Sequence, residues 1–221
     1  MPESGARTLV NTLLQLGVTN LFTLSGNQIL SIYDAIIDTP LRLIHTRHEA
    51  AAVHMADAWG RATENPGVAL VTAGPGHCNT ISALYVARMA ESPLVLLSGH
   101  CAQSDIGTGA FQEMDQVAIA APVCKASWIM THPNRIREDL EYAFYLARNG
   151  RPGPVHISIP SDILGLPLSD SNPDSSKTPV APSPNKINKT DRSTVLSKLR
   201  SAKKPVAVSY THLTLPTNRE V

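Results

Sequence analysis

The sequence lacks the features that mark several common classes of protein. Its 221 residues contain 19 Lys and Arg against 18 Asp and Glu, with no basic run, so neither nucleic acid nor a membrane is an expected partner. The sequence contains no run of about 18 apolar residues, so no transmembrane helix is expected. The amino terminus has neither the basic start nor the continuous apolar core of a signal peptide, so we expect a cytoplasmic protein.

Cysteine is also sparse. Cys78, Cys101 and Cys124 are widely spaced and odd in number, and no C-x-x-C motif occurs. We therefore expect free thiols in a reducing compartment, and neither a disulfide framework nor a zinc site. The absence of G-x-x-x-x-G-K-[ST] likewise excludes a P-loop nucleotide site.

The pattern that is present, over residues 1–165, is an alternation of short apolar segments with helix-like segments. Because the apolar segments are nearly continuous, both faces of the resulting sheet should be covered. The alternation predicts an α/β fold with a doubly wound, mostly parallel sheet and helices on both faces. Residues 101–130 fit neither pattern. Strands are expected at 20–24, 41–46, 67–73, 93–99 and 153–160, and helices at 4–16, 28–37, within 45–62, at 77–90 and at 134–149.

The composition changes after Leu164. Residues 166–189 are rich in Ser, Pro and Asn, which is typical of a linker. Residues 190–208 read as a capped helix and a strand (203–209), the start of a second, truncated α/β domain. Residues 209–221 have no periodicity that continues a fold and resemble translated adapter read-through, so we interpret them as a non-native or disordered tail.

Polar sequences follow four of the predicted strands. They are SGNQ (25–28), His48-Glu49, GPGHCN (74–79) and GHC (99–101). In an open parallel sheet, ligands bind beyond the carboxyl ends of the strands. The agreement of the four loops predicts a polar-ligand site there. GPGHCN follows the third strand and reads G-x-G-x-x-N, so it is not a dinucleotide fingerprint, but it would let the backbone approach a flat ring.

Glu49 allows three interpretations. A metal site fails because His48 and His54 are six residues apart, which leaves them about 120° apart around a helix. A helix-cap role would stabilise the helix by roughly 0.3–1 kcal/mol through the macrodipole. A proton-handling role is favoured by the helix sequence, because AAAVHMADAW is nearly all apolar and should be buried on most sides. A partly desolvated carboxylate there is suited to sharing a proton.

Three blocks resemble a known family. Residues 47–79, 111–128 and 150–164 are similar to the amino-terminal pyrimidine-binding domain of thiamine-diphosphate enzymes, in particular the acetolactate synthase-like group. The blocks occur in family order, and the resemblance covers about residues 4–165. It implies that Glu49 is catalytic: the matching glutamate hydrogen-bonds the cofactor's aminopyrimidine and stabilises the tautomer that removes the thiazolium C2 proton.

The resemblance also implies the roles of other residues and of the whole protein. The full-length enzyme would decarboxylate a 2-oxo acid and transfer the remaining unit to an acceptor, in branched-chain amino acid biosynthesis. Ser25 stands where the family has proline, and core packing is the alternative role for Phe111. His77, Cys78 and His100 have no family role. The expected cofactor-binding residues are Ser25, Gly26, Glu49, Thr72, Gly74, Pro75, Gly76 and Asn79, and the expected substrate-binding residues are Asn27, Gln28, Phe111 and Gln112.

The family's remaining parts are not matched by this sequence. The motif that ligates Mg²⁺ belongs to a carboxyl-terminal domain, and a central domain binds FAD in some members. Family members bind the cofactor across a subunit interface, so the resemblance implies a homodimer or homotetramer at full length and an inactive fragment alone. Two alternatives stay open. One is a 2-hydroxyacyl-CoA or oxalyl-CoA lyase of the same superfamily, and the other is a non-catalytic α/β binding module in which Glu49 is a helix-cap carboxylate.

Overall fold

The computed structural model describes residues 4–168 and 188–206. The chain divides into two units, Met1–Val180 and Ala181–Val221, which are described separately. Within the described residues, no helix is both long enough and apolar enough to cross a membrane.

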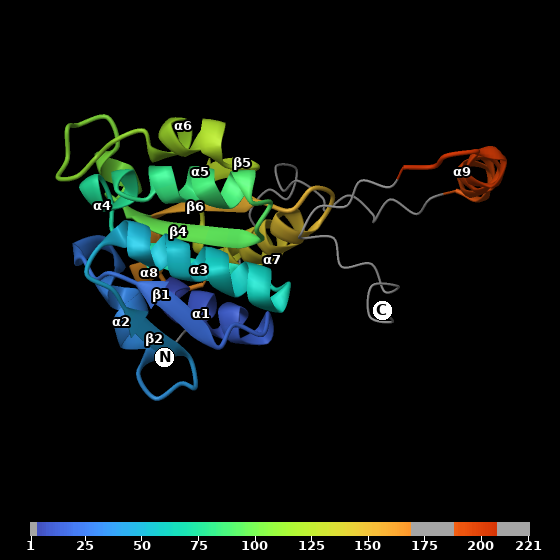
Figure 1. Ribbon diagram of the computed structural model, residues 1–221. Helices are drawn as coiled ribbons and strands as arrows, with labels where there is room; N and C mark the ends of the chain where they lie inside the picture. Colours follow the sequence, from blue (N-terminus) through green and yellow to red (C-terminus); the bar gives the residue numbers. More distant parts are fainter. Residues whose placement is uncertain (1–3, 169–187, 207–221) are drawn as a thin grey trace. The chain divides into compact units, whose positions relative to one another are not determined.

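The first unit is built on a six-stranded, all-parallel sheet (Figure 1). The strand order is β2-β1-β3-β4-β6-β5. This arrangement confirms the predicted doubly wound α/β fold. The strands are β1 (Asn20–Thr23), β2 (Arg42–His45), β3 (Gly67–Val71), β4 (Leu94–His100), β5 (Ala126–Ile129) and β6 (Pro154–Pro160).

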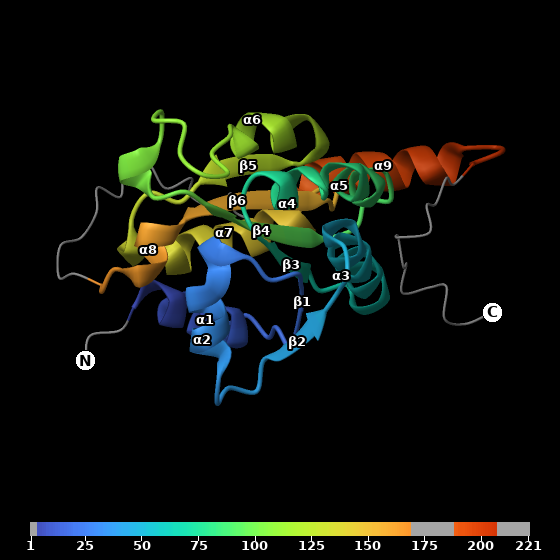
Figure 2. The same cartoon turned by 90° about the vertical axis from the view of Figure 1, so that its left-hand side faces the viewer.

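Helices cover both faces of the sheet (Figure 2). One face packs against α1, α2, α7 and α8, and the other against α3, α5 and α6. Short elements complete the unit. The bounds are α1 (Gly5–Gln15), η1 (Asn27–Ile29), α2 (Leu30–Ile36), α3 (Glu49–Thr63), α4 (Pro75–Cys78), α5 (Ile81–Met89), η2 (Gln103–Asp105), α6 (Gln116–Ala120), η3 (Ala121–Val123), η4 (Pro133–Arg135), α7 (Ile136–Arg148) and α8 (Ser161–Gly165).

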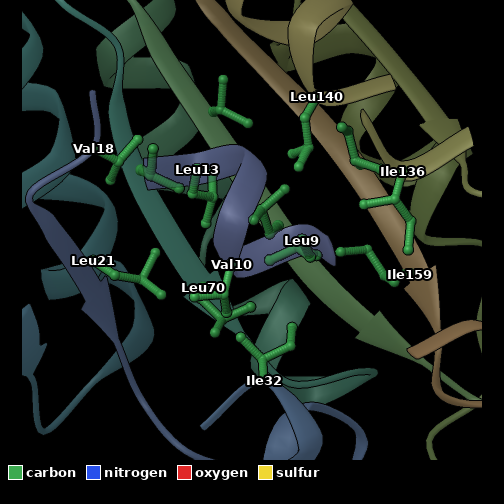
Figure 3. Close-up of a cluster of buried hydrophobic side chains, with 14 of the residues drawn as sticks. Leu9, Val10, Leu13, Val18, Leu21, Ile32, Leu70, Ile136, Leu140 and Ile159 are labelled. Atoms are coloured by element: carbon green, nitrogen blue, oxygen red, sulfur yellow. The ribbon is translucent and has the colours of Figure 1, made fainter. Parts of the chain in front are cut away.

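The alternation of side chains along the buried strands creates two separate cores. In β3, Val68 and Leu70 join one core while Ala69 and Val71 join the other, as the two-residue period of a strand requires. The first core contains large aliphatic side chains from α1 and α7 (Figure 3). The second core uses small residues of α3 and α5, such as Ala52. Small residues let these helices lie close to the sheet.

Helix α3 is less buried than the sequence predicted. We expected burial on most sides, yet His54, Met55 and Ala58 are exposed. The buried positions Ala52, Val53, Ala56, Asp57 and Gly60 recur every three or four residues, so a single face meets the sheet. The apolar composition therefore reflects one buried face and one exposed apolar face.

One further prediction was wrong in detail, and two elements were not predicted. The helix expected at 77–90 is divided into α4 and α5. The fifth strand in chain order, β5, lies in the region 101–130 that fitted no pattern; all four of its residues are only partly buried, so it carries no continuous buried run. Helix α8 was also not predicted.

The second unit contains one described helix, α9 (Lys189–Ser201). Its cap is Asn188, whose side chain accepts from Asp191 N at 2.7 Å. Residues 203–206 of the strand expected at 203–209 are not a strand, and the rest of that strand lies outside the described residues. Most of the predicted linker and the predicted tail also lie outside them.

Candidate functional site

The strand order brings the loops after β1, β2 and β3 together at the carboxyl ends of the strands, and we call the site between these loops the crevice. From β1 the chain first runs outward to β2, and then returns to place β3 on the other side of β1. This reversal is a topological switch point, where open α/β sheets bind ligands. The loops after β1, β2 and β3 all meet there, and they carry most of the predicted site residues.

Glu49 is the first residue of α3 and faces the loop that follows β3. Its Oε2 accepts a hydrogen bond from Asn79 Nδ2 at 2.9 Å. The N-cap is His48, whose Nδ1 accepts from Ala50 N at 3.1 Å. The capping hydrogen bond therefore belongs to His48, and the Glu49 carboxylate is directed elsewhere, to Asn79.

The turn Gly74-Pro75-Gly76 packs closely against its surroundings. Gly74 has φ 58° and ψ −118°, a conformation that glycine alone adopts readily. A Cβ built on Gly76 would lie 2.7 Å from Thr72 Cγ2 and 3.4 Å from Glu49 Oε1. The turn therefore brings Thr72 and Glu49 to the same place without side-chain bulk between them.

The loop after β1 completes this side of the crevice. A Cβ on Gly26 would collide with the Thr72 side chain, and Thr72 Oγ1 donates to the buried Gln28 Oε1 at 2.6 Å. Ser25 and Asn27 are exposed. The structure thus gathers Gly26, Thr72 and the 74–76 turn beside Glu49 and Asn79, while Ser25 and Asn27 face solvent.

Phe111 and Gln112 lie on the loop between η2 and α6. Phe111 is 71% exposed, so its alternative role in core packing is wrong. Gln112 has φ 61°, a left-handed conformation that is uncommon for a residue other than glycine. A Cβ on Gly74 would lie 2.9 Å from Gln112 Cβ, so Gln112 rests directly on the glycine turn.

Gln116 holds the turn in place, and the sequence analysis did not find it. Its Oε1 accepts from Gly74 N at 2.8 Å. Its Nε2 lies 2.9 Å from Ser98 Oγ and 3.0 Å from both Gly99 O and Ser158 Oγ. This buried amide connects β4, β6 and the turn. No local pattern marks it, because its partners come from distant segments.

Buried histidines pack behind the turn. The His77 and His156 rings are 4.5 Å apart. His156 hydrogen-bonds Ser98 and Ser127, both at 2.8 Å, while neither ring nitrogen of His77 has a hydrogen-bond partner among the described residues. Burial lowers the pKa of His77 to about 4, so this ring is neutral at neutral pH. Within residues 4–168 and 188–206, no three His, Cys, Asp or Glu side chains are close enough to hold a metal ion.

Comparison with known families identifies the family of the chain. The family model described as "Thiamine pyrophosphate enzyme, N-terminal TPP binding domain" matches residues 3–119, which include every element of the crevice. The chain belongs to this family.

Relatives of this TPP-binding domain are acetolactate synthase large subunits. The chain is 48% identical over 166 residues to isozyme 3 of Escherichia coli strain K12, covering 73% of this chain and 28% of the relative. It is 34% identical over 209 residues to the Lactococcus lactis IL1403 large subunit, covering 94% and 36%. With the probable large subunit of Methanocaldococcus jannaschii, the identity is 39% over 159 residues, covering 72% and 27%. The chain thus spans about a third of these relatives or less.

Proposed function

We propose that this chain is the part of an acetolactate synthase-like enzyme that binds the aminopyrimidine of thiamine diphosphate. The observation that carries the proposal is the Glu49 carboxylate, held by Asn79 at 2.9 Å against the glycine turn. The relatives reported above are all named acetolactate synthases, which favours this function over a CoA lyase or a non-catalytic module. The complete protein would act on 2-oxo acids as a decarboxylase and carboligase, in branched-chain amino acid biosynthesis.

The crevice suits a flat heterocycle. At Gly26, Gly74 and Gly76 a Cβ would collide with Thr72 or Gln112, so these side chains pack directly on the glycines and the wall there is backbone. Both carboxylate oxygens of Glu49 can accept hydrogen bonds. Asn79 occupies Oε2, and no described residue donates a hydrogen bond to Oε1. One acceptor oxygen is therefore available for a ring N–H.

Each residue has a distinct task in this proposal. When bound, thiamine diphosphate supplies the carbanion chemistry and acts as the electron sink. Glu49 would share a proton with the aminopyrimidine through Oε1, as a general acid–base group does. Asn79 fixes the orientation of the carboxylate, and Gln116 fixes the turn through Gly74 N. Thr72, which is hydrogen-bonded to Gln28, forms the base of the crevice.

We assign the remaining cofactor contacts to other parts of the protein. Residues 4–168 contain no cluster of side chains that could hold a metal ion. Mg²⁺, the diphosphate and any FAD would therefore be bound by other parts of the protein. Helices α3 and α5 pack against each other (Figure 2). A second copy of the chain would cover their exposed apolar side chains. These side chains are Met55, Tyr85, Val86 and Met89. A homodimer or homotetramer is therefore the proposed assembly.

The test is Glu49→Gln in the complete enzyme, with cofactor C2 hydrogen exchange as the readout. Glutamine keeps the size and the hydrogen bond to Asn79 but cannot share a proton, so exchange should slow by about 100-fold or more. Glu141→Gln makes the same change at an exposed position of α7 and serves as the control. Equal exchange rates in the two variants would remove Glu49 from the mechanism.

A further inference from the structure

Residues 104–113 form a loop that has no hydrophobic anchor. None of its side chains is buried, and residues 104–109 are all exposed. Segments with few buried apolar contacts are normally the first to open. Yet this loop carries Phe111 and Gln112 to the edge of the crevice, and Gln112 packs on Gly74. Its conformation therefore depends on polar contacts.

Glu113 supplies the contacts to residues 107, 109 and 110 through both oxygens of its carboxylate, while Thr108 bonds Asp105 O. Oε2 accepts from Gly109 N at 2.8 Å and from Ala110 N at 2.9 Å, and Oε1 accepts from Gly107 N. The Glu113 amide donates back to Ala110 O at 3.0 Å. Hydrogen bonds to an ionised acceptor are stronger than neutral ones. The backbone N–H of Gly107, followed by that of Ala110, lowers the pKa of Glu113, so the group is ionised at neutral pH.

The contacts of Glu113 fix both ends of the Phe111-Gln112 segment. Ala110 precedes the pair and Glu113 follows it, so the two residues span a closed turn. The left-handed φ of 61° at Gln112 is a strained conformation, and such strain persists only where the surroundings hold it. The contacts of Glu113 hold the Gln112 backbone from the loop side, and Gln112 packs against the Gly74 backbone on the crevice side.

We propose that Glu113 is a positioning residue for the substrate. Its carboxylate holds the 104–113 loop in the conformation that presents Phe111 and Gln112 to the 2-oxo acid. The proposal rests on the function proposed above, because it takes those two residues as substrate contacts. Glu113 acts through the loop backbone, so its loss should affect substrate binding and leave proton sharing by Glu49 intact.

The test compares Glu113→Gln with Asp105→Asn. The amide of glutamine keeps one acceptor oxygen and turns an NH₂ group toward backbone N–H donors, so at least one charge-assisted hydrogen bond is lost. In the complete enzyme we expect KM for the 2-oxo acid to rise about tenfold, with kcat and C2 exchange changed by less than about threefold. Asp105→Asn makes the same charge change in the same loop, where the carboxylate accepts from Ser104 Oγ at 3.0 Å, and should leave KM unchanged.

Amide hydrogen exchange on the 221-residue chain tests the loop without any cofactor. Glu113→Gln should speed exchange at Gly107, Gly109 and Ala110 about tenfold relative to the Asp105→Asn control. Unchanged exchange would overturn the structural part of the proposal. Faster exchange with an unchanged KM would overturn its functional part. Failure of the proposed function itself would show separately, as C2 exchange that is insensitive to Glu49→Gln.

Discussion

Three glycines allow backbone strain and close packing at the site to be measured separately. Gly17 has φ +82° with nothing near a built Cβ, Gly76 has a close contact without a positive φ, and Gly74 has both. Alanine at Gly17 should destabilise the fold by about 1 kcal/mol, through strain alone. Alanine at Gly76 overlaps Thr72 Cγ2 at 2.7 Å, well inside the usual contact of about 3.5–4.0 Å, and should destabilise it by about 1–3 kcal/mol.

Gly74→Ala should combine the two effects. A strained φ of 58° and an approach of 2.9 Å to Gln112 Cβ together predict a loss of about 2–6 kcal/mol. Urea unfolding of the 221-residue chain, followed by circular dichroism, measures all three variants, with an unchanged m-value as the check for two-state behaviour. If Gly74→Ala is no less stable than Gly17→Ala, then Gln112 does not pack on the turn and the geometry of the crevice is wrong.

Other perturbations test the core, the buried histidines and the apolar face. Leu9→Ala empties a fully buried position of α1 and should lower the urea-unfolding free energy by about 2–5 kcal/mol. His77 has a folded pKa of about 4 against 6.5 when unfolded. The unfolded chain therefore binds the extra proton, and stability should fall on the order of 3 kcal/mol as pH drops from 6.5 to 4. His77→Phe should flatten this pH profile in urea titrations, and His54→Gln, at an exposed position, should not; equal profiles would refute the assignment. Met89→Glu should weaken self-association of the complete enzyme by about tenfold or more in sedimentation equilibrium, whereas Glu141→Gln should leave it unchanged.

The sequence predicts most of the fold because burial on both faces leaves a direct signal. Val68, Leu70 and Val95 belong to runs in which every residue is buried, and such runs read as strands without alignment or structure. Strand β5 gives no such signal, because it lies at the edge of the sheet and all four of its residues are partly exposed. Its place in the sheet is decided by pairing with β6, a contact that no local pattern contains.

The residues of the site also fall into two groups, those that the sequence predicts and those that it does not. Glu49 and the glycine turn are identifiable because unusual residues stand directly after predicted strands. Gln116 and Glu113 are not. The Glu113 carboxylate bonds backbone N–H groups, which have no sequence signature, and Gln116 bonds two backbone groups and two serine hydroxyls from distant segments. Gln116 reaches Gly74 N, and Glu113 reaches Gly107 N. Only the folded chain shows that these two side chains hold the loops that carry the recognisable residues.

The break between α4 and α5 explains how Asn79 reaches Glu49. Residues 81–89 form a helix with Ala83 and Ala87 directed at the sheet. If that helix continued back to residue 77, as its sequence suggests, Asn79 would lie within about 40° of Ala83 around the axis and would point into the core. Instead, Thr80 donates to His77 O from both its backbone N, at 2.9 Å, and its Oγ1, at 2.6 Å. With these contacts α4 ends after one turn, and Asn79 is exposed. Its amide can therefore donate to the Glu49 carboxylate. The interruption of the helix is therefore a requirement of the site, since an unbroken helix would bury an amide and leave Glu49 without its partner.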